Sequence, residues 1–131
     1  MDSMTVKTDV PLSRISDLLC CALEGGSNYW YEIEAIKEPP AYVFRSMPDK
    51  IFRHLDAPLN SFGHLDIVTR DRDEVNGKNS WVLNLNTIRE GLKTFAVKYP
   101  SHYAEFLKEN EDATTGDVFL QCCLFREVVF G

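Results

Sequence analysis

The stretch CALEGGSNYWYEIEA, residues 21–35, constrains the fold more than any other part of this sequence. Apolar residues upstream of Gly25 recur every three or four positions, whereas residues 29–36 alternate. The period therefore changes from 3.6 to 2 residues within a short turn, which predicts a helix followed closely by a strand. Gly25 is expected to end the helix in a left-handed conformation, because glycine has no Cβ to clash there.

Other segments continue the same mixture of strands and helices. Alternation and β-branched residues predict strands at four places: residues 4–9, 29–36, 64–69 and 81–85. The last two flank a loop containing Asn76-Gly77, so they are expected to form a hairpin. Residues 41–44 are expected to be extended, and a short helix is predicted to start at Ser46.

The last third of the chain is expected to be helical. The motif TIRE at Thr87 is typical of a capping box, and Pro100 is well placed to open a second helix. Thr114 or Thr115 is expected to cap a final helix that is apolar almost all round and therefore central. The sequence predicts an α+β fold in a single domain over residues 1–131, with an antiparallel sheet of about four strands and helices packed on one face.

The composition argues against several classes of protein. Hydrophobic residues make up 44% of the 131 residues, which is typical of a globular domain. The apolar runs are too short to cross a bilayer and no signal peptide is recognisable, so a cytoplasmic location is expected. The net charge of −6 argues against direct binding of nucleic acid, which usually needs a basic face, but it permits binding to a basic protein surface.

The four cysteines form two adjacent pairs, Cys20-Cys21 and Cys122-Cys123. Neighbours on a helix point about 100° apart, so neither pair is expected to bond to itself or to hold a metal ion. Their apolar surroundings favour buried free thiols over catalytic thiolates.

A few polar residues have the spacing of a reactive site. His64 and Asp66 share a face of a predicted strand, which suits a metal-binding or acid–base pair with His54 as a third member. A solvated sheet face is the simpler interpretation. The loop RDRDEVNG, residues 70–77, lacks the ligand pattern of a calcium-binding loop. No catalytic residue, metal or cofactor is assigned, and a small hydrolase acting through His64 and Asp66 is only a third hypothesis.

Two segments carry residues suited to a ligand pocket. The two glycines would let a ligand approach the backbone, and the aromatic residues after them offer a stacking surface. A buried glutamine on the final helix needs partners for its amide, which the Gly-Gly-Ser-Asn turn could supply. The candidate pocket residues are Gly25, Gly26, Asn28, Tyr29, Trp30, Asp117 and Gln121. The alternative is a helix cap followed by core aromatic residues.

Both segments resemble a family of small proteins encoded by bacteriophages and other mobile elements. The first matches the pattern E-G-G-x-x-Y-W at Glu24, Gly25, Gly26, Tyr29 and Trp30. The second matches D-A-x-T-x-D-x-x-x-Q, and the glycine at the end of the pattern, at Asp112, Ala113, Thr115, Asp117, Gln121 and Gly131. Arg126 departs from the pattern, which has glycine there. The resemblance implies a phage-related origin and supplies no catalytic residue.

The leading hypothesis is accordingly an accessory protein that inhibits a bacterial defence system, similar in style to anti-CRISPR proteins. It would occupy a basic surface of a host defence protein, since complementary charge speeds encounter and sets register. Five carboxylates are the candidate contacts: Glu32, Glu34, Glu109, Glu111 and Asp112. The alternative is a small-molecule binder that sequesters a nucleotide signal in a pocket beside Trp30.

Overall fold

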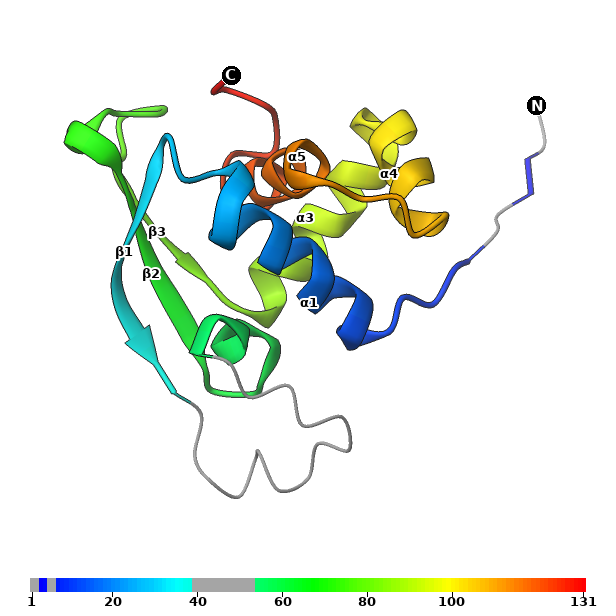
Figure 1. The fold of residues 1–131 in the computed structure, drawn as a ribbon, viewed down its shortest axis with the longest axis horizontal. Helices are drawn as coiled ribbons and strands as arrows, with labels where there is room; N and C mark the ends of the chain where they lie inside the picture. Colours follow the sequence, from blue (N-terminus) through cyan, green and yellow to red (C-terminus); the bar gives the residue numbers. More distant parts are fainter. Residues whose placement is uncertain (1–2, 5–6, 39–53) are drawn as a thin grey trace.

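The computed structural model describes residues 3–4, 7–38 and 54–131 (Figure 1). Four α-helices, three strands and three short helices of other types follow one another in these ranges. In chain order they are α1 (Leu12–Cys21), η1 (Ala22–Gly26), β1 (Tyr31–Lys37), η2 (His54–Leu59), β2 (His64–Thr69), η3 (Arg70–Arg72), β3 (Ser80–Leu83), α3 (Leu85–Lys98), α4 (Pro100–Leu107) and α5 (Ala113–Phe125).

The strands form one antiparallel sheet in the order β1-β2-β3, so the predicted α+β class is confirmed. The expectation of about four strands is too high by one for the part of the chain that the structure describes. Residues 4 and 7–9 of the strand predicted at 4–9 belong to no strand, and residues 5–6 lie outside the described ranges. Met4 is 98% exposed, so alternation in this segment corresponds to no buried face.

Two further elements were predicted in the connection between β1 and β2. The extended piece at 41–44 and the start of the helix at Ser46 lie outside the described residues. The described part of the connection ends in η2, a 3-10 helix that contains Pro58. A buried hydrogen bond of 2.7 Å from Ser16 Oγ to Asp56 Oδ1 fastens η2 to α1.

The helices lie on one side of the sheet, and α5 runs through the middle of them (Figure 1). Most of α5 is buried, including Phe119 and Leu120, which confirms the prediction of a central final helix. Two glycines let neighbouring backbones approach it closely. A Cβ at Gly116 would lie 2.6 Å from the backbone nitrogen of Ala22, and a Cβ at Gly91 would lie 2.4 Å from Cys123 Sγ.

Two helices are capped one turn earlier than the sequence suggested. Asn84 Oδ1 accepts a hydrogen bond of 2.9 Å from the Thr87 amide, so Asn84, not Thr87, caps α3. Asp112 Oδ1 accepts bonds from the Thr115 amide at 2.9 Å and the Thr115 hydroxyl at 3.0 Å, and it caps α5 in place of a threonine. These bonds favour the charged carboxylate and lower the pKa of Asp112.

The first helix ends in a π-helical turn, η1, and the expectation of a left-handed Gly25 is wrong. The Ser27 amide donates to the Ala22 carbonyl at 2.8 Å, five residues back. Among the described glycines, positive φ angles occur at Gly77 and Gly131 and not at Gly25. Gly26 is needed for a different reason, because a Cβ there would lie 2.0 Å from the carbonyl oxygen of Ala113. The turn therefore packs directly against the start of α5.

Strand β1 contains a β-bulge at Glu34. Glu34 is the residue with none opposite it, between the pairs Ile33–Ile67 and Ala35–Asp66. One extra residue inverts the alternation of faces along a strand. Ile36 therefore lies opposite the buried Leu65 on the core side, whereas simple alternation had placed it on the outer face with Glu34.

Left-handed residues shape two other connections. Asn76 (φ 52°) and Gly77 (φ 79°) form the two-residue turn of the predicted hairpin loop, closed by a bridge between Val75 and Lys78. Arg126, with φ 65°, ends α5. Its guanidinium donates to the Cys122 and Cys123 carbonyls at 3.3 and 3.1 Å, which stabilises a conformation that glycine adopts more readily.

Candidate functional site

The Gly-Gly-aromatic turn and α5 meet at the carboxylate of Asp117, which is only 8% exposed. Its Oδ1 atom accepts hydrogen bonds from Ser27 Oγ at 2.7 Å, Trp30 Nε1 at 2.7 Å and Gln121 Nε2 at 3.2 Å. Its Oδ2 atom accepts one from the Tyr29 hydroxyl at 2.7 Å. Burial and this hydrogen bond raise the pKa of Tyr29 to about 12. Asp117 thus holds the turn in place through three neutral donors, while the fourth, Gln121, lies on α5 itself.

Gln121, which is fully buried, fastens the C-terminal segment to α5. Its Oε1 atom accepts the backbone N–H groups of Val129 at 2.7 Å and Phe130 at 2.8 Å, and its Nε2 atom donates to the Phe130 carbonyl at 3.1 Å. The expected link between Gln121 and the Gly-Gly-Ser-Asn turn exists only through Asp117. The glutamine amide pairs with this segment as the backbone of a neighbouring strand would.

Trp30 belongs to the core and offers no free stacking surface. It is 3% exposed. Its ring lies parallel to that of Phe130, with centroids 5.2 Å apart and 9° between the planes, and a second phenylalanine, Phe125, also lies 5.2 Å away. The protein's own aromatic side chains therefore pack against the indole.

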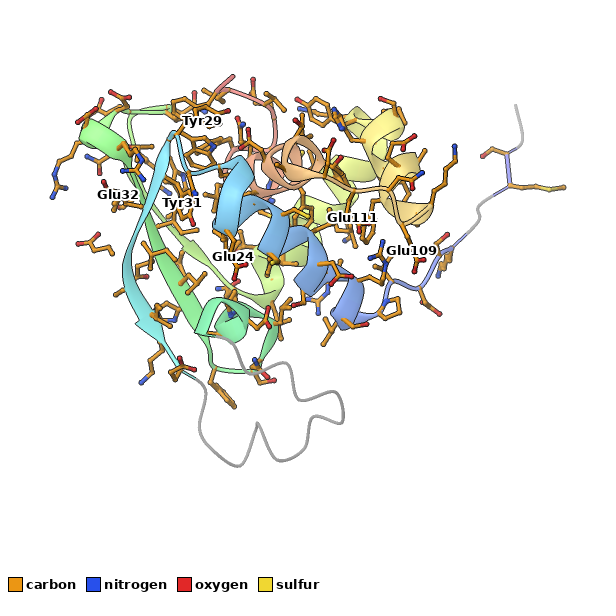
Figure 2. The ribbon with its side chains drawn as sticks, in the orientation of Figure 1. Glu24, Tyr29, Tyr31, Glu32, Glu109 and Glu111 are labelled. Atoms are coloured by element: carbon orange, nitrogen blue, oxygen red, sulfur yellow. The ribbon has the colours of Figure 1, made fainter. Side chains whose placement is uncertain are left out.

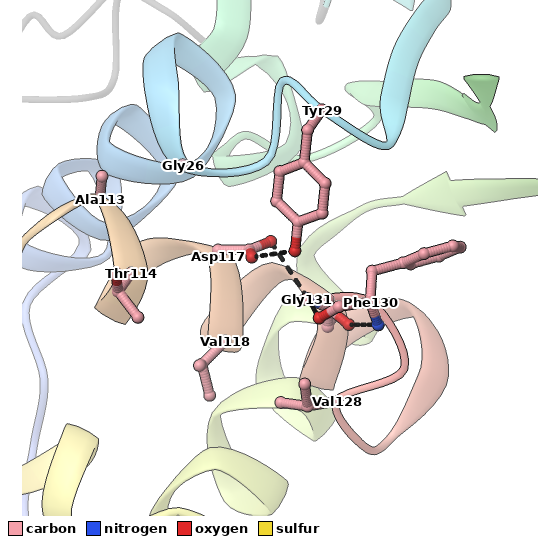
Figure 3. Close-up of a pocket in the computed structure, with 10 residues that line it drawn as sticks. Gly26, Tyr29, Ala113, Thr114, Asp117, Val118, Val128, Phe130 and Gly131 are labelled. Atoms are coloured by element: carbon pink, nitrogen blue, oxygen red, sulfur yellow. Dashed lines mark hydrogen bonds between the residues drawn. The ribbon is translucent and has the colours of Figure 1, made fainter.

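A pocket of about 360 Å³ opens beside the carboxylate, and we call it the Asp117 pocket (Figure 3). It is lined by Gly26, Tyr29, Ala113, Thr114, Asp117, Val118, Gln121, Val128, Phe130 and Gly131. Four of the candidate residues from the sequence meet here: Gly26, Tyr29, Asp117 and Gln121. Residues 128–131 were not predicted to contribute, because only the glycine at Gly131 was part of a recognisable pattern.

The other three candidate pocket residues lie elsewhere. Gly25 is exposed, and a Cβ built on it would meet no atom within 4 Å. Asn28 is exposed, and its backbone carbonyl accepts a hydrogen bond of 2.6 Å from Arg70 Nε. Trp30 is enclosed in the core. Ser27 takes their place in the network, although it was predicted only as a turn residue.

The five candidate acidic contacts do not form one surface (Figure 2). Glu32 and Glu34 lie on β1, whereas Glu109, Glu111 and Asp112 lie in the connection from α4 to α5. Figure 2 shows Glu32 and Glu109 on opposite sides of the molecule. The five carboxylates therefore belong to two separate acidic regions, and not to the single acidic surface expected from the sequence.

The acidic region before α5 is largely used for structure. The Arg14 guanidinium contacts both carboxylate oxygens of Glu111, donates to the Phe106 carbonyl at 2.8 Å and stacks on the Phe106 ring with its central carbon 4.8 Å from the centroid. The hydrogen bond to Glu111 raises the pKa of Arg14. Asp112 is the cap of α5. Glu109, whose side chain is 76% exposed, is the carboxylate of this region that is most available to a partner.

The outer face of the sheet is covered by none of the described helices (Figure 1). An open depression of about 430 Å³ on it is lined by Glu34, Asp66, Lys78, Ser80, Trp81 and Val82. Glu32 lies on the same face and pairs with Arg70 at 2.9 Å. We define the open sheet face by the outward side chains Glu32, Glu34, Asp66 and Val82.

The candidate reactive groups do not converge within the described ranges. His64 Nε2 and Asp66 Oδ1 are 3.4 Å apart on the half-exposed end of β2, and the side chain of His54 lies outside the described part. No three histidine, cysteine or acidic side chains are placed to hold a metal ion among the residues described. Burial raises the pKa of Cys122 to about 12 and raises that of Cys123 as well, which disfavours thiolates.

The remaining two cysteines correct a prediction. Cys20 and Cys21 are half-buried and not enclosed, while all four thiols are free of disulfides.

In the ranges that the structure describes, no helix combines the length and the apolar character needed to cross a bilayer.

Comparison with protein-family models, curated proteins and solved structures finds no match for this chain. Its function is therefore inferred from the open sheet face and the Asp117 pocket.

Proposed function

We propose that this chain is a non-catalytic binding protein of phage or mobile-element origin that inhibits a bacterial defence system, in the style of anti-CRISPR proteins. It acts in the host cytoplasm by occupying a basic surface of a defence protein. The observation that carries this proposal is the open sheet face, where Glu34 and Asp66 line a depression together with the 47% exposed side chain of Val82. Apolar contact with a charged surround is the usual composition of a transient protein interface.

Charge supports a basic partner. The chain carries a net charge of −6, and Glu32, Glu34 and Asp66 place part of it on adjacent strands. Proteins that handle nucleic acids present basic surfaces, so an acidic sheet competes for the same sites. Complementary charge of this kind raises the association rate and fixes register.

The nucleotide alternative is less well supported by the Asp117 pocket. None of the residues that line the pocket is basic, and its polar wall bears a carboxylate. A phosphate group placed there would meet a like charge. The hydrolase alternative has only the pair His64 and Asp66, at 3.4 Å, to support it.

Plaque formation tests the proposal. Bacteria that carry an RNA-guided effector nuclease directed at a phage would express the wild-type chain, a triple variant Glu32→Lys, Glu34→Lys, Asp66→Lys, or a control triple variant Glu90→Lys, Glu105→Lys, Glu127→Lys. The wild type should restore plaques in the targeted strain. The first variant should lose this effect by roughly tenfold or more, which corresponds to about 1.4 kcal/mol of binding.

The control variant changes the net charge by the same amount away from the sheet, and it should keep the wild-type effect. Equal loss in both triple variants would mean that net charge alone matters and would reject the open sheet face. No restoration of plaques by the wild-type chain against any effector tested would reject inhibition of this class of defence system.

A further inference from the structure

Asp117 carries a buried negative charge that nothing in the described part of the chain neutralises. Its four hydrogen-bond partners are a serine, a tyrosine, a tryptophan and a glutamine, all of them uncharged. The indole and amide N–H groups are donors only, so Oδ1 is an acceptor. The Tyr29 hydroxyl donates to Oδ2 at 2.7 Å, so Oδ2 is an acceptor as well. A carboxyl group that accepts at both oxygens is ionised, and buried charges are normally paired.

The two carboxylate oxygens are not equally occupied. Oδ1 accepts three hydrogen bonds, whereas Oδ2 accepts one, from Tyr29. A carboxylate offers about four acceptor positions in total, roughly two on each oxygen. Oδ2 can therefore accept a further donor, and Asp117 and Tyr29 both line the pocket (Figure 3).

Most other residues of the Asp117 pocket are apolar or small, and Tyr29, Thr114 and Gln121 add uncharged polar groups. Val118 and Val128 supply hydrocarbon walls, and Gly26 and Ala113 leave room between η1 and α5. Its volume of about 360 Å³ lies near the lower end of the range for small-molecule sites, about 300–1,000 Å³. The pocket thus combines one negative group with a lining that suits a short alkyl chain.

We propose that the Asp117 pocket binds a primary alkylammonium group. The ammonium donates to Asp117 Oδ2 and to the oxygen of the Tyr29 hydroxyl, and the alkyl chain packs against Val118 and Val128. Two sources carry this chemistry, a lysine side chain of a partner protein and a free polyamine. The pocket shares no lining residue with the open sheet face, so binding here goes beyond the function proposed above and does not depend on it.

Titration followed by backbone amide NMR signals tests this site directly. The probes are Nα-acetyl-lysine methylamide, spermidine and the uncharged 1-pentanol. Either amine should produce saturable shifts confined to the signals of Gly26, Thr114, Val118 and Val128, and 1-pentanol should produce none. Tighter binding of the lysine derivative would indicate a partner's side chain as the source, and tighter binding of spermidine would indicate a free polyamine.

Three results would overturn the proposal. The first is that neither amine produces a saturable shift. The second is that 1-pentanol produces the same shifts as the amines, which would show that charge is irrelevant. The third is that adenosine monophosphate, added as a fourth probe, is the one compound that produces saturable shifts, which would indicate an anionic ligand.

Two variants place the binding in the pocket. Asp117→Asn removes the charge but keeps an oxygen for Ser27 and Trp30, and it should weaken amine binding by about tenfold or more. Val128→Trp fills the pocket without removing a side-chain hydrogen bond and should abolish binding even if Asp117→Asn fails to fold. Val97→Trp, at an 80% exposed position of α3, is the matched control and should bind as the wild type does. Unchanged binding by Val128→Trp would exclude the Asp117 pocket as the site.

Discussion

The indole Nε1 of Trp30 donates a 2.7 Å hydrogen bond to Oδ1 of Asp117, although the two residues are 87 positions apart in the chain. The bond joins the start of the sheet to the central helix. Ser27 Oγ reaches the same oxygen at 2.7 Å, so one carboxylate fixes both the turn and the aromatic residue that follows it. The Gly-Gly-aromatic stretch is therefore a connection between helix and sheet that also forms one wall of a pocket.

Replacing Asp117 with alanine should lower the free energy of unfolding by about 3 kcal/mol, because buried donors left without an acceptor cost about 1–3 kcal/mol each. Urea unfolding followed by tryptophan fluorescence measures this loss. Asp117→Asn should lose less than half as much, since it retains one oxygen. Glu105→Ala, at an exposed position of α4, should stay within about 0.5 kcal/mol of the wild type. A loss as small for Asp117→Ala would contradict the structural role of the carboxylate.

The two adjacent glycines should respond in opposite ways to alanine. Gly26→Ala places a Cβ 2.0 Å from the carbonyl oxygen of Ala113, and this overlap should destabilise the fold by about 3 kcal/mol. Gly25→Ala meets no atom within 4 Å and has no positive φ, so it should be neutral or stabilising by up to about 1 kcal/mol. Thermal unfolding of the matched pair compares them, and similar melting temperatures would refute the close contact of η1 with α5.

Asp112 should make stability depend on pH in the acid range. Its pKa in the folded chain is lowered from 3.8 by bonds from Thr115, so the ionised form favours folding. This contribution is complete above pH 3.8 and is lost as the pH falls through the lower folded value. Asp112→Ala should cost about 1 kcal/mol near neutral pH, and the difference from the wild type should shrink toward about pH 2. Urea unfolding of the wild type and of Asp112→Ala across this range measures it.

Tyr29 should be the tyrosine of the pocket that resists ionisation. Its pKa is raised from 10.0 to about 12 by burial and by the hydrogen bond to Asp117, so the neutral phenol favours folding. That stabilisation is complete below pH 10 and is lost as the pH rises toward 12. The ultraviolet difference titration of wild type against Tyr29→Phe reports this group alone. A midpoint at the ordinary value would contradict the bond to Asp117, and Asp117→Asn should move the midpoint downward.

Much of the fold follows from hydrophobic period, because period records which face of an element is buried. The alternation of Leu65 and Ile67 predicted β2, and the nearly continuous apolar sequence of residues 118–125 predicted a buried α5. The segment at 4–9 alternates equally well, but its described residues, 4 and 7–9, join no strand of the sheet. Alternation predicts which face of a strand could be buried, but the rest of the fold determines whether that face is buried.

Caps and pockets were harder to predict, for physical reasons. Thr87 and Thr115 each match a capping pattern on their own. In the structure, however, the side chains of Asn84 and Asp112, three residues earlier, accept hydrogen bonds from the threonine amides and therefore cap the helices. Tyr29 was a candidate because an aromatic ring offers a stacking surface, and Gln121 was a candidate because a buried amide needs partners. The position of residues 128–131 was not predicted. Gln121 holds them through their backbone N–H groups, and contacts to backbone cannot be recognised from a pattern of side chains.

The bulge at Glu34 has a consequence for how this chain can vary in length. The pairs on either side of it, Ile33–Ile67 and Ala35–Asp66, are already consecutive along β2. Loss of Glu34 would therefore join two halves of a ladder that are in frame, without moving any other pair. The sheet can do without this residue, and its carboxylate is free to serve something outside the molecule.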